Sequence, residues 1–172
     1  MSDIKLNIGC GADYRPGFIN IDASDVLSNV DKVIDLSVES LCHHFCNDSI
    51  DFIVANDFIE HHFHWEALNL LKDFHAILKP GGKCEIRVPD CSKIIKSWRL
   101  STEEKLILLF GGQDVEQDGC EDMRFSRRKY PQLFCHKYGW TKDRLKKDLS
   151  IAGFSKVSFT SAGTNVVSIA IK

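Results

Sequence analysis

The sequence predicts an α/β protein in which helices cover one mainly parallel sheet. Three observations support this fold class. The stretch Lys5–Asp13 alternates apolar and polar residues and then enters a turn with two glycines. Apolar, strand-like runs alternate with helical patterns along most of the chain. Residues 155–161 and 165–171 form two alternating segments around Ala162-Gly163-Thr164, which is typical of an antiparallel hairpin.

The composition fits one globular domain over residues 1–172. The apolar runs are too short to cross a bilayer, the N-terminus lacks a secretory pattern, and no membrane partner is expected. Seven cysteines without a C-x-x-C pair suggest reduced thiols in a cytoplasmic protein. Residues 1–90 hold 7 basic and 15 acidic residues, net −8, whereas residues 91–172 hold 15 and 9, net +6. This asymmetry is either surface variation or a preference for an anionic ligand in the second half.

The first half supplies four predicted strands, at residues 4–9, 18–22, 32–36 and 49–56. The fourth is mostly apolar, as expected of a central parallel strand that is buried on both faces. Pro16 and Gly17 leave little room for a helix between the first two strands, so we expect the first helix to be shortened or absent. Residues 37–45 form a short, poor helix or an irregular loop.

The second half begins with the clearest helix, residues 65–78, whose apolar residues follow a 3.6-residue period. Lys79-Pro80-Gly81-Gly82 ends it. The further expected elements are a strand at 83–89, helical pieces at 92–100 and 103–110, and a helix at 141–152 that ends at Gly153. Residues 111–137 form a long irregular stretch. A loop of this length is usually functional or disordered, and its aromatic residues favour function.

The glycine turn is compatible with more than one nucleotide. A dinucleotide-binding turn needs G-x-G-x-x-G at the start of a helix and an acidic residue about 20 positions later. Here Tyr14 stands at the third glycine position, and Asp22 follows Gly9 by 13 residues. A P-loop would need a Gly-Lys-Ser/Thr sequence, which the chain lacks. A nicotinamide oxidoreductase is therefore disfavoured.

Several segments in a fixed order resemble the class I S-adenosylmethionine-dependent methyltransferases, especially the small stand-alone methyltransferases similar to type 11. The segments are Leu6–Gly11, Pro16–Asp22, Glu60-His61, Leu78–Gly82, Val88–Asp90, Phe110–Gln113, His136–Trp140 and Ala152–Phe154. The resemblance extends over nearly the whole chain. It implies a Rossmann-like fold with a seven-stranded sheet whose last strand is antiparallel to its neighbour. It also implies S-adenosylmethionine as cofactor, across the carboxyl ends of the first four strands.

The cofactor-binding residues implied by the resemblance are Asn7, Gly9, Cys10, Gly11, Asp22, Ala23, Asp35, Leu36, Asn56, Asp57 and His61. The backbone at the two glycines can approach the methionine end, where a side chain would collide. Asp22 can accept hydrogen bonds from the ribose hydroxyls, as short carboxylates do in other nucleotide folds. Asp35 and Leu36 would border the adenine. Both aspartates could instead cap turns, a frequent role of Asp.

Methyl transfer depends on the positioning of nucleophile, methyl and sulfur, and a hydroxyl or protonated amine acceptor also needs a base. His136 is the favoured base, because it belongs to the irregular stretch expected over the acceptor. His62, Asp57 and Asp90 are the alternatives. A zinc site of His61, His62 and His64 is not expected, because three imidazoles on one short turn cannot easily converge on one ion. We therefore expect no metal.

The favoured function is methylation of a small molecule, with O-methylation of a sugar, nucleotide-sugar or related anionic metabolite as the specific hypothesis. Residues 110–140 would form an insertion on the acceptor side, and Arg124–Lys129 could contact an acidic acceptor. A nucleic-acid acceptor is disfavoured, since the chain lacks a broad basic footprint, and a protein acceptor is also a less favoured alternative. The alternative is a non-catalytic S-adenosylmethionine-binding or partner module. Both a monomer and a homodimer are compatible with the sequence.

Overall fold

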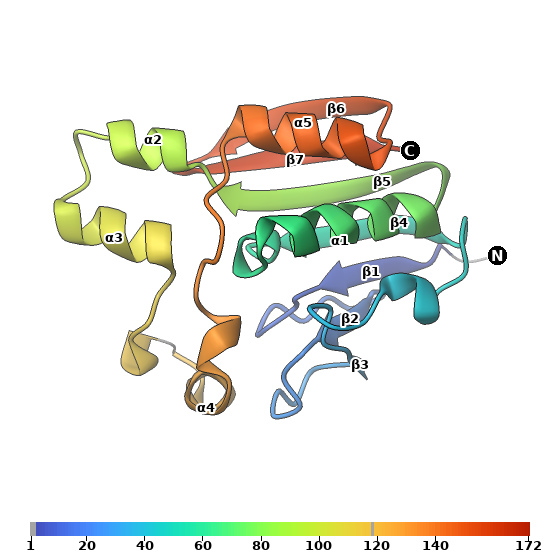
Figure 1. Cartoon of the computed structure of the whole chain (residues 1–172). Coiled ribbons are helices and arrows are strands. Elements are labelled where there is room, and N and C mark those ends of the chain that lie inside the picture. The colour runs from blue at the N-terminus through green and yellow to red at the C-terminus, as the bar shows by residue number, and fades with distance from the viewer. Residues whose placement is uncertain (1–2, 118) are drawn as a thin grey trace.

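The computed structural model describes residues 3–117 and 119–172. These residues contain one seven-stranded sheet (Figure 1). The spatial order of the strands is β3-β2-β1-β4-β5-β7-β6. Their bounds are Lys5–Ile8 (β1), Ile19–Asp22 (β2), Lys32–Val33 (β3), Ile50–Asn56 (β4), Leu78–Pro89 (β5), Lys156–Ala162 (β6) and Asn165–Ile171 (β7). β1 to β5 pair in parallel, and β7 is antiparallel to both β5 and β6. The predicted sheet and its closing hairpin are confirmed.

Five α-helices accompany the sheet within the described residues. They are His64–Ile77 (α1), Cys91–Lys96 (α2), Thr102–Phe110 (α3), Glu121–Lys129 (α4) and Lys142–Ala152 (α5). In Figure 1, α1 and α5 lie along one face of the sheet, whereas α3 and α4 lie beyond the carboxyl ends of the parallel strands. Thr141 caps α5 by accepting a hydrogen bond from the Arg144 amide at 3.2 Å, and Gly153 ends it in the left-handed conformation, as predicted.

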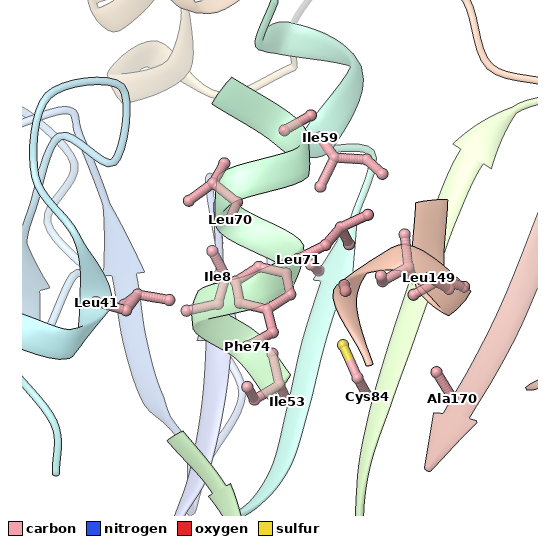
Figure 2. Close-up of a cluster of buried hydrophobic side chains, with 14 of the residues drawn as sticks. Ile8, Leu41, Ile53, Ile59, Leu70, Leu71, Phe74, Cys84, Leu149 and Ala170 are labelled. Atoms are coloured by element: carbon pink, nitrogen blue, oxygen red, sulfur yellow. The ribbon is translucent and has the colours of Figure 1, made fainter. Parts of the chain in front are cut away.

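The hydrophobic core lies between α1, α5 and the central strands. Leu71 and Phe74 of α1 are fully buried against Ile8 and Ile53 of the sheet (Figure 2). Burying a side chain of this size contributes roughly 1.5–3 kcal/mol. β1 and β4 contain consecutive buried residues, Leu6–Ile8 and Ile53–Ala55, whereas β5 alternates buried and more exposed residues. This rigid layer fixes the positions at which β1, β2 and β4 end.

The chain between β1 and β2, where every residue is described, contains turns and no helix, as the sequence predicts. β3 is shorter than the predicted 32–36, because Asp35 ends the extended chain early. Its carboxylate accepts hydrogen bonds from the Ser37 amide at 2.9 Å and the Ser37 hydroxyl at 2.6 Å. Such a local side-chain turn competes with strand pairing. The helical piece expected at 92–100 also ends early, at Lys96.

The stretch 111–137 is not wholly irregular, so that part of the prediction is wrong. It contains α4 and two short 3-10 turns, Val115–Gln117 and Pro131–Leu133. The apolar period of α4 is weak, but its charges favour a helix. Acidic residues occupy its first turn and basic residues its last, which complements the helix dipole. The basic run Arg124–Lys129 therefore lies on a helix and not in a loop.

Candidate functional site

The glycine turn after β1 has left-handed backbone at Gly9 (φ 64°) and Gly11 (φ 50°). A Cβ atom at Gly9 would lie 2.9 Å from Cγ of Phe58 and closer still to its Cδ2. There are thus two reasons for glycine at this position: its left-handed backbone and the lack of space for a Cβ beside Phe58. Gly11 has more room, since the nearest atom to a Cβ there is Cε of Met123 at 3.7 Å.

Asn7 holds the glycine turn from below. Its side-chain amide donates to the carbonyl of Asp13 at 2.7 Å and to Oδ1 of Asn20 at 3.0 Å. Asn20 donates in turn to Asp31 at 2.9 Å. Cys10 is buried beside this network. Burial, with a further contribution from the charge of Asp22, raises the pKa of the Cys10 thiol to about 12, so it stays protonated.

Asp22 ends β2 with its carboxylate between two backbone amides. Oδ2 accepts from Gly11 at 2.8 Å, and Oδ1 accepts from Ser24 at 3.0 Å. A carboxylate offers about four lone-pair positions, so each oxygen can accept another hydrogen bond. The residue is only partly buried and lines a cavity. The arrangement suits a ligand with two neighbouring hydroxyl groups.

One cavity of about 190 Å³ lies at the carboxyl ends of β1, β2 and β4. It brings together nine of the predicted residues, namely Gly9, Gly11, Asp22, Ala23, Asp35, Leu36, Asp57, His61 and His62. The first six form its floor and its β2–β3 side. The last three come from the segment that follows β4. The cavity therefore spans the strand ends at which the cofactor is expected.

Five predicted residues do not line this cavity: Asn7, Cys10, Asn56, Asp90 and His136. Asp90 is 4% exposed and caps α2 by accepting from the Ser92 amide at 3.1 Å. The Asn56 amide lies 3.5 Å from Glu85. His136 lies behind His61, with the two ring centroids 4.9 Å apart.

A roof covers the cavity, formed by part of the segment expected on the acceptor side, but its attachment to the chain after β2 was not predicted. Its lining residues are Met123, Ser126, Leu133, Phe134 and Lys137, from α4 and the segment that follows it. The buried Ser126 hydroxyl donates to Ser24 at 2.7 Å. Asp25 accepts from Lys129 at 2.9 Å and from Tyr130 at 2.7 Å. The roof is thus attached to the chain just after Asp22. The sequence carries no local signal for this contact, since its partners lie more than 100 residues apart.

Asp57 has an unusual backbone for a residue other than glycine, with φ 51°. Its amide donates to the Arg87 carbonyl at 2.8 Å, and its carboxylate pairs with the Arg87 guanidinium. The hydrogen bonds that Arg87 donates to Asp57 raise the pKa of Arg87. Left-handed backbone at a non-glycine residue costs on the order of 1 kcal/mol and often occurs at functional sites. Both oxygens of the Asp57 carboxylate accept hydrogen bonds from Arg87.

A cluster of titratable groups adjoins the cavity. Burial lowers the pKa of His61 to about 4, and it also lowers the pKa of His62 and His136. These imidazoles are therefore neutral near pH 7 and keep a lone pair. Burial has the opposite effect on Glu60, whose pKa is raised well above its ordinary value. Glu60 is 1% exposed.

The geometry fits S-adenosylmethionine. The glycine turn gives a ligand access to bare backbone, Asp22 keeps acceptor positions for hydroxyls, and Leu36 and Ile34 supply an apolar wall. Among the described residues, none of the helices combines the length and the apolar character of a membrane span.

Comparisons with known proteins agree with this geometry. A family model described as a methyltransferase domain matches residues 6–157. A search of curated proteins found no significant match. Among solved structures, a SAM-dependent methyltransferase from Archaeoglobus fulgidus is similar at a TM-score of 0.63 and 14% identity, covering 99% of this chain and 86% of that one.

Two further structures show the same fold. A Burkholderia thailandensis 1,6-didemethyltoxoflavin-N1-methyltransferase, solved with that substrate and S-adenosylhomocysteine, has a TM-score of 0.56 and 16% identity, covering 98% of this chain and 70% of that one. A Bordetella parapertussis protein described as a possible exported protein has a TM-score of 0.59 and 16% identity, covering 99% and 61%. This chain thus spans under two thirds of that protein's length. On the family match, the chain belongs to the methyltransferase domain family, within the class I S-adenosylmethionine-dependent methyltransferases.

Proposed function

We propose that this chain transfers the methyl group of S-adenosylmethionine to an oxygen of a small anionic metabolite, such as a sugar or nucleotide-sugar. The observation that carries the proposal is the cavity at the strand ends, which combines a glycine floor, Asp22 and a roof. When bound, the cofactor supplies a methyl group activated by its sulfonium. The protein contributes binding, orientation and exclusion of water.

Different predicted residues would bind different parts of the cofactor. Gly9 and Gly11 would approach the methionine end, and Asp22 would hold the ribose hydroxyls. Asp35 and Leu36 would border the adenine. Each of these side chains or backbone groups lines the cavity, which supports their assignment. Asn7 and Cys10 would act indirectly, since the first braces the turn and the second fills space below it.

The acceptor preference rests on Lys137. The basic run of α4 is largely paired within the protein: Arg124 and Arg128 with acidic side chains of the same segment, and Lys129 with Asp25. Lys137 lines the cavity, and its Nζ lies 5.5 Å from the centroid of the Phe63 ring, with no carboxylate paired to it in the described part of the chain. Its ammonium would meet an anionic group of the acceptor.

The four predicted bases differ in availability. Asp57 is ion-paired with Arg87, and Asp90 caps α2 outside the cavity lining. His62 lines the cavity, with Nδ1 3.3 Å from the Phe58 carbonyl, and its neutral ring can accept a proton at Nε2. His136 contacts the ring of His61 and reaches the cavity only through it.

Calorimetric titration with S-adenosylmethionine and S-adenosylhomocysteine tests the proposal. Asp22→Asn should weaken binding about 10- to 100-fold, because hydrogen bonds to a charged group contribute roughly 1.5–3 kcal/mol. Asp13→Asn is the matched control, since Asp13 is an exposed carboxylate of the same turn that does not line the cavity. It should change affinity less than threefold. No binding by the wild type at millimolar ligand would refute the proposal.

We also propose a homodimer in a reducing, cytoplasmic setting. None of the residues of α3 is buried, although Leu106, Ile107 and Phe110 are large and apolar. A second copy of the chain would cover this face of α3. All seven cysteines are free, which agrees with a reducing setting. Light scattering should give twice the 19.5 kDa of one chain. Ile107→Glu should yield a monomer, whereas Ile151→Glu, at an equally exposed position on α5, should not.

A further inference from the structure

Glu60 is a buried carboxylate whose own protein environment does not satisfy it. It follows β4 in the short 3-10 turn Ile59–His61. It is 1% exposed, and neither carboxylate oxygen has a hydrogen-bond partner among the described residues. A buried carboxylate in this setting is expensive, because no hydrogen bond from another described residue offsets its desolvation. A protein retains such a group when it has a specific task.

Two imidazoles face the same point. One carboxylate oxygen of Glu60 and one ring nitrogen each of His61 and His136 all lie within 4.8 Å of one another. Nδ1 of His61 lies 3.2 Å from the carbonyl oxygen of Cys135. A carbonyl only accepts hydrogen bonds, so Nδ1 carries the proton and Nε2 carries the lone pair. Metal-binding histidines are typically oriented in this way by a backbone carbonyl.

The backbone holds the three residues together although they are far apart in sequence. The Glu60 carbonyl accepts from the amides of Lys137 at 2.8 Å and Tyr138 at 3.3 Å. The amide of His136 donates to the Phe110 carbonyl at 3.0 Å. A Cβ at Gly111 would overlap the Phe134 carbonyl and lie 3.1 Å from Cδ2 of His136. This close approach, like the hydrogen bonds, fixes His136 beside the turn after β4.

We propose that Glu60, His61 and His136 bind one divalent first-row transition-metal ion at the edge of the cofactor cavity. Two histidines and one carboxylate are a ligand set for Zn²⁺ or Fe²⁺, and three protein ligands leave further positions open. The expectation of a metal-free site considered only the His61-His62-His64 turn. The proposed site takes one histidine from that turn and completes the set from distant segments.

The metal would also define the acceptor. His61 lines the cavity, so the open positions of an ion bound to it adjoin the acceptor side. A bound cation polarises an oxygen ligand and favours its ionised form, which selects a hydroxyl acceptor. This second step rests on the proposed methyltransferase function. In it, His136 is a metal ligand and not the base.

Direct metal binding tests the site without any turnover. Untagged protein, freed of metal with a chelator, is titrated with Zn²⁺ by calorimetry and with Co²⁺ by visible absorption. The wild type should bind one ion of each metal. Glu60→Gln and His136→Ala should each weaken binding at least 10-fold, whereas His43→Ala, at an exposed histidine remote from the cluster, should match the wild type. Zn²⁺ binding that is absent, or unchanged in Glu60→Gln, would overturn the proposal.

A second measurement separates this proposal from the proposed function. Glu60 does not line the cavity, so Glu60→Gln should still bind S-adenosylhomocysteine within threefold of the wild type, which also shows that it folds. If the wild type binds Zn²⁺ but does not bind S-adenosylhomocysteine, only the proposed methyltransferase function is refuted. The open positions are tested with acetohydroxamate, an oxygen chelator. It should change the Co²⁺ spectrum of the wild type, and an unchanged spectrum would refute an open site.

Discussion

The floor and the roof of the cavity at the strand ends are built in different ways. The floor consists of the glycine turn and Asp22, which continue β1 and β2 above the fully buried Leu6, Ile8 and Ile21. Backbone hydrogen bonds and left-handed glycines set its shape. The roof consists of α4 and residues 130–137, which are joined to the β2 end by side chains, several of them exposed.

This difference predicts unequal local stability. Exposed ion pairs contribute about 0–1 kcal/mol each, whereas the floor shares the stability of the core on which it rests. The roof should therefore open at a lower free energy than the floor, which would let ligands enter a cavity that is otherwise covered. Substitutions in the floor should therefore reduce stability and cofactor binding more than substitutions in the roof.

The largest effect is expected for Gly9→Ala. The new Cβ would collide with the Phe58 ring and occupy left-handed backbone. Overpacking costs roughly 1–3 kcal/mol and the conformation about 1–2 kcal/mol more. Urea denaturation should show both losses, and cofactor binding should disappear.

Gly17→Ala separates the two contributions. Gly17 also has a positive φ, of 80°, but no described heavy atom lies within 4 Å of a Cβ placed there. This variant should lose only about 1–2 kcal/mol of stability and keep its cofactor affinity. Equal losses in the two variants would show that Phe58 moves aside and that the contact is not restrictive.

A smaller effect is expected in the roof, from Ser126→Ala. The change removes the donor of a buried hydrogen bond and leaves the Ser24 hydroxyl unpaired, which costs about 1–3 kcal/mol. Cofactor affinity should fall several-fold. Ser24→Ala with Ser126→Ala should cost less than the sum of the single changes, because no unpaired group remains. Strict additivity, measured by denaturation, would show that the two hydroxyls are not coupled.

The sequence predicted the floor better than the roof for a physical reason. The seven strands, the end of α1 and the glycine turn depend on local periodicity and turn chemistry, which a sequence displays directly, although β5 begins at Leu78 and not at residue 83 as predicted. Asp22 was proposed from the family resemblance, and its position at the end of β2 agrees with that proposal. The roof instead depends on pairings such as Ser24 with Ser126, which no local pattern encodes.

The Glu60, His61 and His136 cluster shows the same limit. Glu60-His61 was noticed as a motif, and His136 as a candidate base, but the two lie 75 or more positions apart. Their meeting depends on the amides of Lys137 and Tyr138 binding the Glu60 carbonyl. The ion pair between Asp57 and Arg87 was missed for the same reason, since it forms only when β4 and β5 lie side by side.

The smallest effect is expected for Asp25→Asn, at the exposed edge of the roof. Hydrogen bonds from Lys129 and then Tyr130 lower the pKa of Asp25 below its ordinary value of 3.8. Because the folded pKa is the lower one, this attachment is fully present above 3.8 and is lost as the pH falls through the folded value.

At pH 7 the variant should therefore show faster hydrogen exchange at the amides of α4 than the wild type, with the floor unchanged. The difference should shrink as the pH falls through the folded pKa, which lies below 3.8, because the wild-type carboxylate then also becomes neutral. Asp143→Asn, at an exposed carboxylate of α5, serves as the control and should leave α4 exchange unaffected at every pH. A variant that exchanges like the wild type at pH 7 would show that Asp25 does not hold the roof, and that the Ser24–Ser126 and Ser28–Asp122 contacts attach α4 to the β2 end.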